Sequence, residues 1–221
     1  MKPGGRTTAE RATPAGVTTL LLVRHGATSW THDRRLQGRT DIDLSDIGRS
    51  DVAALGPAVA AWAPRSLVVS PLRRTRSTAE LLSTALRDSG EAELPVPVVE
   101  AGWTEHGLGE WEGLTPHEIG DDYARWRAGA LVPPGGEPRD DIRARVAAAV
   151  RSAAALPGPV LVVTHGGTIR AVLAACVGLT AERIEPVAPP SLTVLDVADP
   201  HASEHGPSGV NGARLRHFNI R

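Results

Sequence analysis

Short apolar runs alternate along the chain with longer segments whose apolar residues are spaced three or four apart. The short runs are rich in β-branched residues and predict strands, whereas the longer segments predict amphipathic helices. Strands are expected at 17–24, 66–70, 96–101, 159–165 and 192–198, with an edge strand at 213–220. Helices are expected at 43–63, 71–86, 121–129, 139–156 and 167–178. Ser45 is the expected cap of the first helix, and Pro71 is expected in the first turn of the second.

This alternation predicts an α/β fold of three layers, α/β/α, with a mainly parallel central sheet covered by helices on both faces. We expect a flexible lead-in over residues 1–16 and one domain over 17–221, because no repeat or low-complexity linker divides the chain. Residues 102–138 form an irregular segment rich in Gly, Trp and Pro.

Polar residues follow two of the predicted strands where each strand ends. Arg24 and His25 come directly after LLLV, and His165 follows VLVVT; a glycine comes next in both places. The segment SPLRR, which contains Arg74, begins at the end of a third strand. Ligands of open α/β sheets bind beyond the carboxyl ends of the strands. These side chains are therefore expected to meet in one site.

The residue types at these strand ends suit phosphoryl transfer. The guanidinium groups of Arg24 and Arg74 match the geometry of a phosphate dianion. Both histidines should resist protonation beside these cations, and a neutral imidazole is a competent nucleophile. A carboxyl group near the bound anion, such as that of Glu105, should have a raised pKa and could protonate a departing oxygen. Because the arginines supply positive charge, neither a metal ion nor a cofactor is expected.

Composition and charge narrow the functional classes. The formal net charge of −1 provides no field for attracting nucleic acid, and no apolar stretch approaches the length of a membrane span. The single cysteine, Cys176, excludes an internal disulfide and is expected to be an inert buried thiol. The N-terminus lacks the apolar segment of a signal peptide. We therefore expect a cytoplasmic protein that binds neither nucleic acid nor membranes, with a homodimer as an open alternative to a monomer.

Several segments, in matching order, resemble the histidine phosphatase (phosphoglycerate mutase-like) superfamily. They are VRHGATSW, RRLQGRTDIDLSDIGRSDVAAL, SPLRRTRSTAEL, EHGLGEWEGLTPHE, PPGGE and VLVVTHGGTIRAVLA. One Arg-His-Gly alone would be a weak signal, but the ordered set is specific. The resemblance implies the family's three-layer fold and makes residues 102–138 the segment that caps the active site.

The resemblance also implies a role for each matched residue. His25 would be the nucleophile that becomes phosphohistidine, and Glu105 would protonate the departing alcohol and then activate water. The phosphoryl oxygens would be held by Arg24, Arg74 and His165. Residues bordering the phosphate would be Thr28, Thr31, Gln37, Gly38 and Gly166. Two departures concern the outer pocket: Thr31 replaces a common Asn, and Pro189-Pro190-Ser191 stands where relatives often have Asn before a small residue and Ser.

Some residues keep alternative interpretations. A lone His25 or His165 would be read as a core histidine, but the arginine neighbours favour catalysis. Glu110 and Glu112 compete with Glu105 for the acid role, and only the family alignment selects Glu105. The remaining histidines are expected in surface or structural roles; they are His32, His106, His117, His201, His205 and His217. Four tryptophans either pack loops or line a substrate cleft; they are Trp30, Trp103, Trp111 and Trp126.

The favoured function is a metal-independent phosphatase that acts on a small-molecule phosphate monoester. A phosphoglycerate-type mutase is the first alternative. Mutases of this family carry a long basic insertion before the GGE motif, whereas residues 114–136 here contain only Arg125 and Arg127 as bases. A phosphohistidine protein phosphatase is the second alternative, although those relatives are usually shorter. A binding module without activity is disfavoured because the nucleophile and both arginines are present.

Overall fold

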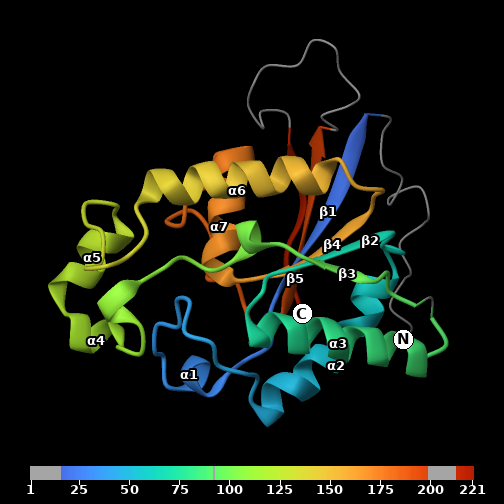
Figure 1. Cartoon of the computed structure of the whole chain (residues 1–221), viewed down its shortest axis with the longest axis horizontal. Helices are drawn as coiled ribbons and strands as arrows, with labels where there is room; N and C mark the ends of the chain where they lie inside the picture. Colours follow the sequence, from blue (N-terminus) through green and yellow to red (C-terminus); the bar gives the residue numbers. More distant parts are fainter. Residues whose placement is uncertain (1–15, 92, 199–212) are drawn as a thin grey trace.

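Six strands form one sheet in the order β3-β2-β4-β1-β5-β6 (Figure 1). The computed structural model describes residues 16–91, 93–198 and 213–221, so His201, His205 and the predicted lead-in, apart from Gly16, lie outside it. The strands are β1 (Val17–Arg24), β2 (Ser66–Val69), β3 (Pro97–Val99), β4 (Val160–Thr164), β5 (Ser191–Ala198) and β6 (Arg214–Ile220). All six predicted strands are confirmed, including the edge position of β6.

The central strands of the sheet are parallel. β1 pairs with β4, β4 with β2 and β2 with β3 in parallel, whereas β5 runs antiparallel to β1 and β6 antiparallel to β5. Strands buried on both faces read as continuous apolar runs, which explains the sequences of β1 and β4. The predicted mainly parallel α/β/α architecture is confirmed.

Two pairs of helices cover the faces of the sheet (Figure 1). α2 (Asp46–Ala60) and α3 (Arg73–Asp88) pack on one face, and α6 (Arg139–Ala154) and α7 (Gly166–Val177) pack on the other. The Ser45 hydroxyl accepts a hydrogen bond from the Gly48 amide, so the predicted cap is confirmed. The placement of Pro71 in the first turn of α3 is wrong. The N-cap is Leu72, whose extended backbone delays the start of the helix.

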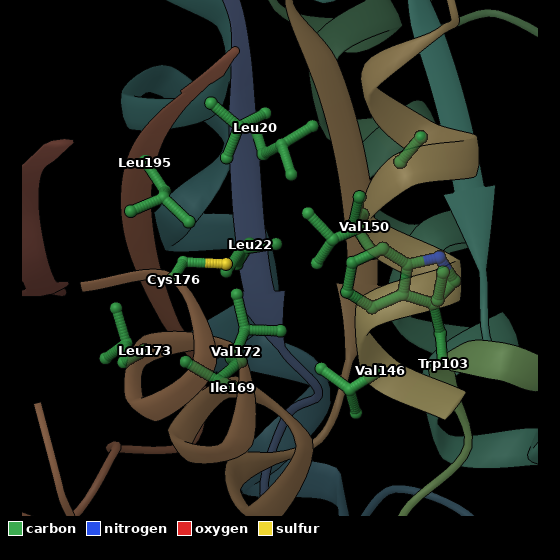
Figure 2. Close-up of a cluster of buried hydrophobic side chains, with 14 of the residues drawn as sticks. Leu20, Leu22, Trp103, Val146, Val150, Ile169, Val172, Leu173, Cys176 and Leu195 are labelled. Atoms are coloured by element: carbon green, nitrogen blue, oxygen red, sulfur yellow. The ribbon is translucent and has the colours of Figure 1, made fainter. Parts of the chain in front are cut away.

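Successive side chains of β1 point to opposite faces of the sheet, and Figure 2 shows the core on the α6–α7 face. Leu20 and Leu22 point toward this face, while Leu21 and Val23 belong to the cluster on the opposite face. Cys176 is buried in the first cluster, and burial raises the pKa of its thiol to about 11. This environment fits the expected inert thiol, because the reactive thiolate form is disfavoured.

Short helices and turns make up the irregular segment. It contains η2 (Ala101–Trp103), η3 (Gly109–Trp111), α4 (Pro116–Ile119) and α5 (Asp121–Arg127), and sequence reasoning identified only α5. The segment pairs with the loop after α1 (Ser29–His32) through two backbone hydrogen bonds, Leu36 N to Leu114 O at 2.9 Å and Gly113 N to Leu36 O at 2.8 Å. Among the described residues, no helix is long and apolar enough to cross a membrane.

Candidate active site

The pairing of β1 with β4 brings the two strand-end histidines together. Arg24 is the register partner of Thr164, and the His25 amide donates a 3.0 Å hydrogen bond to the Thr164 carbonyl. The rings of His25 and His165 meet edge to face with their centroids 5.2 Å apart. Both side chains are almost completely buried. Neighbouring parallel strands end at the same edge, so this proximity follows directly from the two matching sequence patterns.

The hydrogen bonding of His25 determines which ring nitrogen is free. Its Nδ1 lies 2.7 Å from the Gly26 carbonyl oxygen, which can only accept, so Nδ1 carries the proton and Nε2 keeps its lone pair. Burial, followed by the charges of Arg74 and Arg24, lowers the pKa of His25 well below its usual value. The imidazole is therefore neutral, with Nε2 available as a nucleophile.

His165 packs against the His25 ring and is hydrogen-bonded to Ser70, a residue that the sequence analysis did not identify. Its Nε2 lies 2.7 Å from the Ser70 Oγ, while its buried Nδ1 has no hydrogen-bond partner among the described residues. Burial and Arg74 lower the pKa of His165 well below its usual value. With the Ser70 hydroxyl as donor, Nδ1 carries the proton and can donate to an anionic ligand. The only signal for Ser70 was its position as the first residue after β2.

The two arginines are anchored to backbone carbonyls. Arg74 is fully buried and donates to the carbonyls of Thr40, at 2.8 Å, and Gly38, at 2.7 Å. Arg24 donates to the Val187 carbonyl, and the buried Nε of each arginine has no hydrogen-bond partner among the described residues. Burial lowers the pKa of both guanidinium groups to about 10, so they stay charged at neutral pH. Buried cations with unused donors are suited to bind an anion.

The Glu105 carboxylate is bound to the first turn of α7. It accepts hydrogen bonds from the amides of Gly167, at 2.9 Å, and Thr168, at 3.0 Å. Burial alone would raise the pKa of Glu105, but the charge of His106, the hydrogen bonds from the Gly167 and His106 amides and the charge of Arg170 outweigh burial and lower it. The raised pKa expected from the sequence concerns the site with an anion bound, and it stays a prediction. A bound phosphate dianion would shift this pKa upward, because it opposes the negative form of the carboxyl group.

The other two candidate acids are placed differently. The Glu112 carboxylate accepts hydrogen bonds from the Arg39 and Leu108 amides and from the Thr40 hydroxyl, so it holds loops together. Glu110 is exposed to solvent. Of the three glutamates, Glu105 alone lines the same cavity as His25.

A cavity of about 140 Å³ lies against His25. Seven of the residues assigned from the sequence line it: Arg24, His25, Gln37, Gly38, Arg74, Glu105 and Gly166. His165, which is fully buried, does not line it, and neither do Thr28 and Thr31. The two threonines form the capping box of α1, in which the Thr31 hydroxyl accepts hydrogen bonds from the Thr28 amide, at 3.1 Å, and the Gln37 side-chain amide, at 3.0 Å. A Cβ at Gly166 would lie 3.2 Å from the Arg24 Nε, which explains the small residue there.

A second, larger cavity of about 630 Å³ adjoins the first. His106, Trp126, Gly167 and Arg170 line both cavities, and sequence reasoning gave none of them a definite role in the site. His106 therefore belongs to the wall of the site and not to the surface. Trp126 is the tryptophan that lines the cleft, whereas Trp103 lies in the core and the Trp111 ring packs edge-on against Trp126. Among the described residues, no group of three or more His, Cys, Asp or Glu side chains could hold a metal ion.

Comparison with known proteins points to one family. A model of the histidine phosphatase superfamily (branch 1) matches residues 20–205. The chain is 37% identical over 175 residues to glucosyl-3-phosphoglycerate phosphatase of Mycobacterium tuberculosis, covering 72% of this chain and 75% of that protein. It is 31% identical over 206 residues to 2,3-bisphosphoglycerate-dependent phosphoglycerate mutase 2 of Gloeobacter violaceus, covering 86% of this chain and 87% of that protein.

Solved structures agree with this result. The native structure of mycobacterial glucosyl-3-phosphoglycerate phosphatase superposes with a TM-score of 0.75 at 29% identity, covering 93% of this chain and all of that chain.

Proposed function

We propose that His25 is the nucleophile of this protein. The chain belongs to the histidine phosphatase superfamily, and it is a phosphatase that hydrolyses small-molecule phosphate monoesters. In the first step, the His25 Nε2 lone pair attacks phosphorus and the bond to the alcohol oxygen breaks. Glu105 gives its proton to that oxygen. In the second step, water attacks phosphorus, the P–N bond breaks, and Glu105 accepts the proton of the water.

The observation that carries this proposal is the hydrogen bond of His25 Nδ1 to the Gly26 carbonyl. It leaves Nε2 unprotonated beside Arg24 and Arg74, whose charges suit a transferring phosphoryl group. The buried Nδ1 of His165 would supply a further donor to the same oxygens. No step of this scheme requires a metal ion, because the arginines provide the positive charge.

Trapping of the covalent intermediate tests the proposal. Wild-type protein incubated with a ³²P-labelled phosphomonoester and quenched should carry label that is lost in acid and kept in base. His25→Ala should carry none while unfolding in urea like the wild type. Equal labelling of His25→Ala would overturn the assignment and point to His165.

We propose a small organic alcohol as the leaving group. The two relatives described above are named a glucosyl-3-phosphoglycerate phosphatase and a phosphoglycerate mutase, and both names contain a phosphate ester of glycerate. Glucosyl-3-phosphoglycerate is therefore the first compound to assay. Release of inorganic phosphate would support hydrolysis, whereas formation of an isomeric phosphate ester at a higher rate would favour the mutase.

We also propose that the protein forms a homodimer through β3. This strand lies at the edge of the sheet, and three valines in and beside it, Val96, Val98 and Val99, are more than half exposed. An exposed apolar edge strand is a template for pairing with a second chain. Sedimentation should show a dimer for the wild type and a monomer for Val98→Glu; a wild-type monomer at micromolar concentration would refute this.

For location, we propose the cytoplasm. The buried, unpaired Cys176 is compatible with a reducing compartment. Cell fractionation with a cytoplasmic marker tests this, and recovery of the protein outside that fraction would contradict it.

A further inference from the structure

Two polar side chains, Arg170 and His106, lie where the larger cavity meets the proposed phosphate pocket, and the proposed mechanism uses neither of them. The walls of the larger cavity come mainly from α6, α7 and the segment around Leu131–Pro133, and many of its lining side chains are small or aliphatic. Arg170 of α7 and His106 stand where the two cavities adjoin, since both residues line both cavities. A leaving alcohol bound through its phosphate at His25 would have to pass these two side chains.

Arg170 is a half-buried cation without an acidic partner. None of the ion pairs or side-chain hydrogen bonds found among the described residues involves its guanidinium group. Glu105 is near enough to favour its charged form, but that carboxylate is already bound to backbone amides of α7. Arg127 is a second cation close enough to disfavour the charge of Arg170. Among the described residues, Arg170 forms no ion pair with a carboxylate, so its guanidinium group is free to bind an anionic ligand.

The acidic residues of the larger cavity do not neutralise this site. Glu137 binds Arg145 at 2.8 Å and Arg39 at 3.0 Å, so its charge is already compensated. Glu182 is exposed and forms no ion pair among the described residues; the charges that help to lower its pKa are those of Arg127 and Arg139, not that of Arg170.

His106 adds an unused polar atom at the same place. Its Nε2 is buried and has no hydrogen-bond partner among the described residues. Buried polar atoms are rarely left without a partner, so an orphan on the wall of a cavity indicates where a ligand atom binds.

We propose that Arg170, with His106 beside it, binds an acidic group carried by the leaving alcohol of the substrate. The substrate class is then a phosphate monoester whose alcohol bears a carboxylate close to the phosphate, with its remaining part extending into the larger cavity. This inference rests on the proposed function, because it assumes that the phosphate lies at His25. In this scheme Arg170 is a specificity-determining residue: its guanidinium group contacts the carboxylate and takes no part in bond breaking.

A different role for Arg170 would have a different signature. Its charge contributes to the low pKa of Glu105, so it could act only as a positioning residue for the acid. Loss of that role would affect every substrate alike and would shift the part of the pH–rate profile that reflects the titration of Glu105. Loss of a carboxylate contact would affect only esters that carry the carboxylate.

Two esters that differ in one group separate these roles. D-3-phosphoglycerate and sn-glycerol 3-phosphate have the same skeleton, with a carboxylate in the first and a hydroxymethyl group in the second. Binding is measured by calorimetry in the His25→Ala background, where neither ester should be turned over. Arg170→Gln should weaken binding of the carboxylate ester about 10- to 100-fold, the effect of losing one charge-assisted hydrogen bond, and change the glycerol ester less than threefold. Arg151→Gln, an exposed arginine of α6 outside both cavities, should change neither.

The two esters are also compared by kcat/KM in protein that keeps His25. This second measurement gives a result even if binding is too weak for calorimetry. Equal losses for the two esters, or no loss for either, would overturn the proposal, provided that circular dichroism shows Arg170→Gln to be folded. If the variant is unfolded, Arg170→Lys replaces it and should lose part of the preference for the carboxylate ester; an unchanged preference in that variant also overturns the proposal. Failure of the proposed function would look different: the wild type would form no phosphohistidine with either ester.

Discussion

The Glu105 carboxylate accepts a 2.9 Å hydrogen bond from the Gly167 amide, which joins the segment after β3 to the first turn of α7. The same helix begins directly after His165, which follows β4, and His25 follows the neighbouring strand β1. The proposed acid–base group and the two histidines are thus held by neighbouring strands and one helix. The pairing of β1 with β4 places the two histidines, and hydrogen bonds to α7 place Glu105.

The effect of Glu105→Gln should depend on the leaving group. An alkoxide needs a proton as its bond to phosphorus breaks, and such proton transfer contributes about 10²- to 10⁴-fold. An alkyl phosphate should lose about that factor in the single-turnover burst, whereas p-nitrophenyl phosphate should lose far less. Steady-state rates can hide this contrast, because Glu105 also acts in hydrolysis of the intermediate.

The matched controls for that experiment are Glu110→Gln and Glu112→Gln. Glu110 is exposed, so its variant should behave like the wild type. If the selective loss appeared in Glu112→Gln while Glu105→Gln slowed both substrates equally, Glu105 would be the wrong carboxylate.

Gly167→Ala should reproduce much of the Glu105→Gln defect without a change at Glu105. A Cβ at position 167 would overlap the Glu105 carboxylate and force it away from the α7 amides. The burst rate with an alkyl phosphate should fall at least tenfold, a conservative part of the proton-transfer contribution. Gly56→Ala is the control, since its Cβ would lie 3.4 Å from the nearest side-chain atoms of α3 and alanine favours a helix. A wild-type burst in Gly167→Ala would contradict the proposed role of this contact.

The free energy of unfolding should decrease on acidification below about pH 6.5. Burial and Arg74 keep the pKa of His25 and His165 well below the usual value, whereas in the unfolded chain they titrate near 6.5. Between those pKa values the unfolded state binds more protons, so stability rises with pH across this window and its contribution is complete above it. Each histidine contributes as much as about 1.4 kcal/mol per pH unit.

Urea unfolding at pH 7.0 and pH 5.5 measures this dependence. His25→Gln removes one of the two groups and should reduce the difference between the two pH values. The same difference in the variant and the wild type would show that His25 is not held neutral.

Phosphatase activity should survive EDTA. Arg24 and Arg74 each have a buried Nε with no partner in the part of the chain that the structure describes, and they supply the charge that a metal ion provides in other phosphoryl-transfer enzymes. Initial rates are measured after dialysis against EDTA and again after addition of Mg²⁺ or Zn²⁺. Loss of activity that a metal restores would refute the metal-independent mechanism.

Ala174→Leu should discriminate between substrates by size. Ala174 lines the larger cavity, outside the smaller one, and its side chain is exposed, so a leucine there reduces the cavity without disturbing the core. The value of kcat/KM for glucosyl-3-phosphoglycerate should fall about tenfold or more, as expected when a few methylene groups are misplaced in a pocket, while that for 3-phosphoglycerate should stay within twofold. Equal effects on the two compounds would show that the leaving group does not extend into this cavity.

The meeting of Arg24, His25 and His165 could be predicted from the sequence. Two apolar strands with the same ending must place their last residues at one edge if they are parallel neighbours, and the helices between them require a parallel sheet. The alternation of Leu20, Leu21, Leu22 and Val23 between two cores follows from the period of a strand in the same way.

The arrangement of the outer site was decided only by tertiary structure. Glu105, Glu110 and Glu112 lie in a segment without periodicity, so hydrogen bonds to distant backbone groups, and not local pattern, determine which of them faces His25. The family resemblance placed Thr28 and Thr31 beside the phosphate, and only the fold shows that their hydroxyl groups form the cap of α1. Arg170 and His106 gave no signal as a pair, because they lie 64 positions apart along the chain and become neighbours in one wall only when α7 packs beside the irregular segment. Local patterns determine strands, helices and the residues that end them, but the contacts between segments far apart in sequence depend on the packed fold.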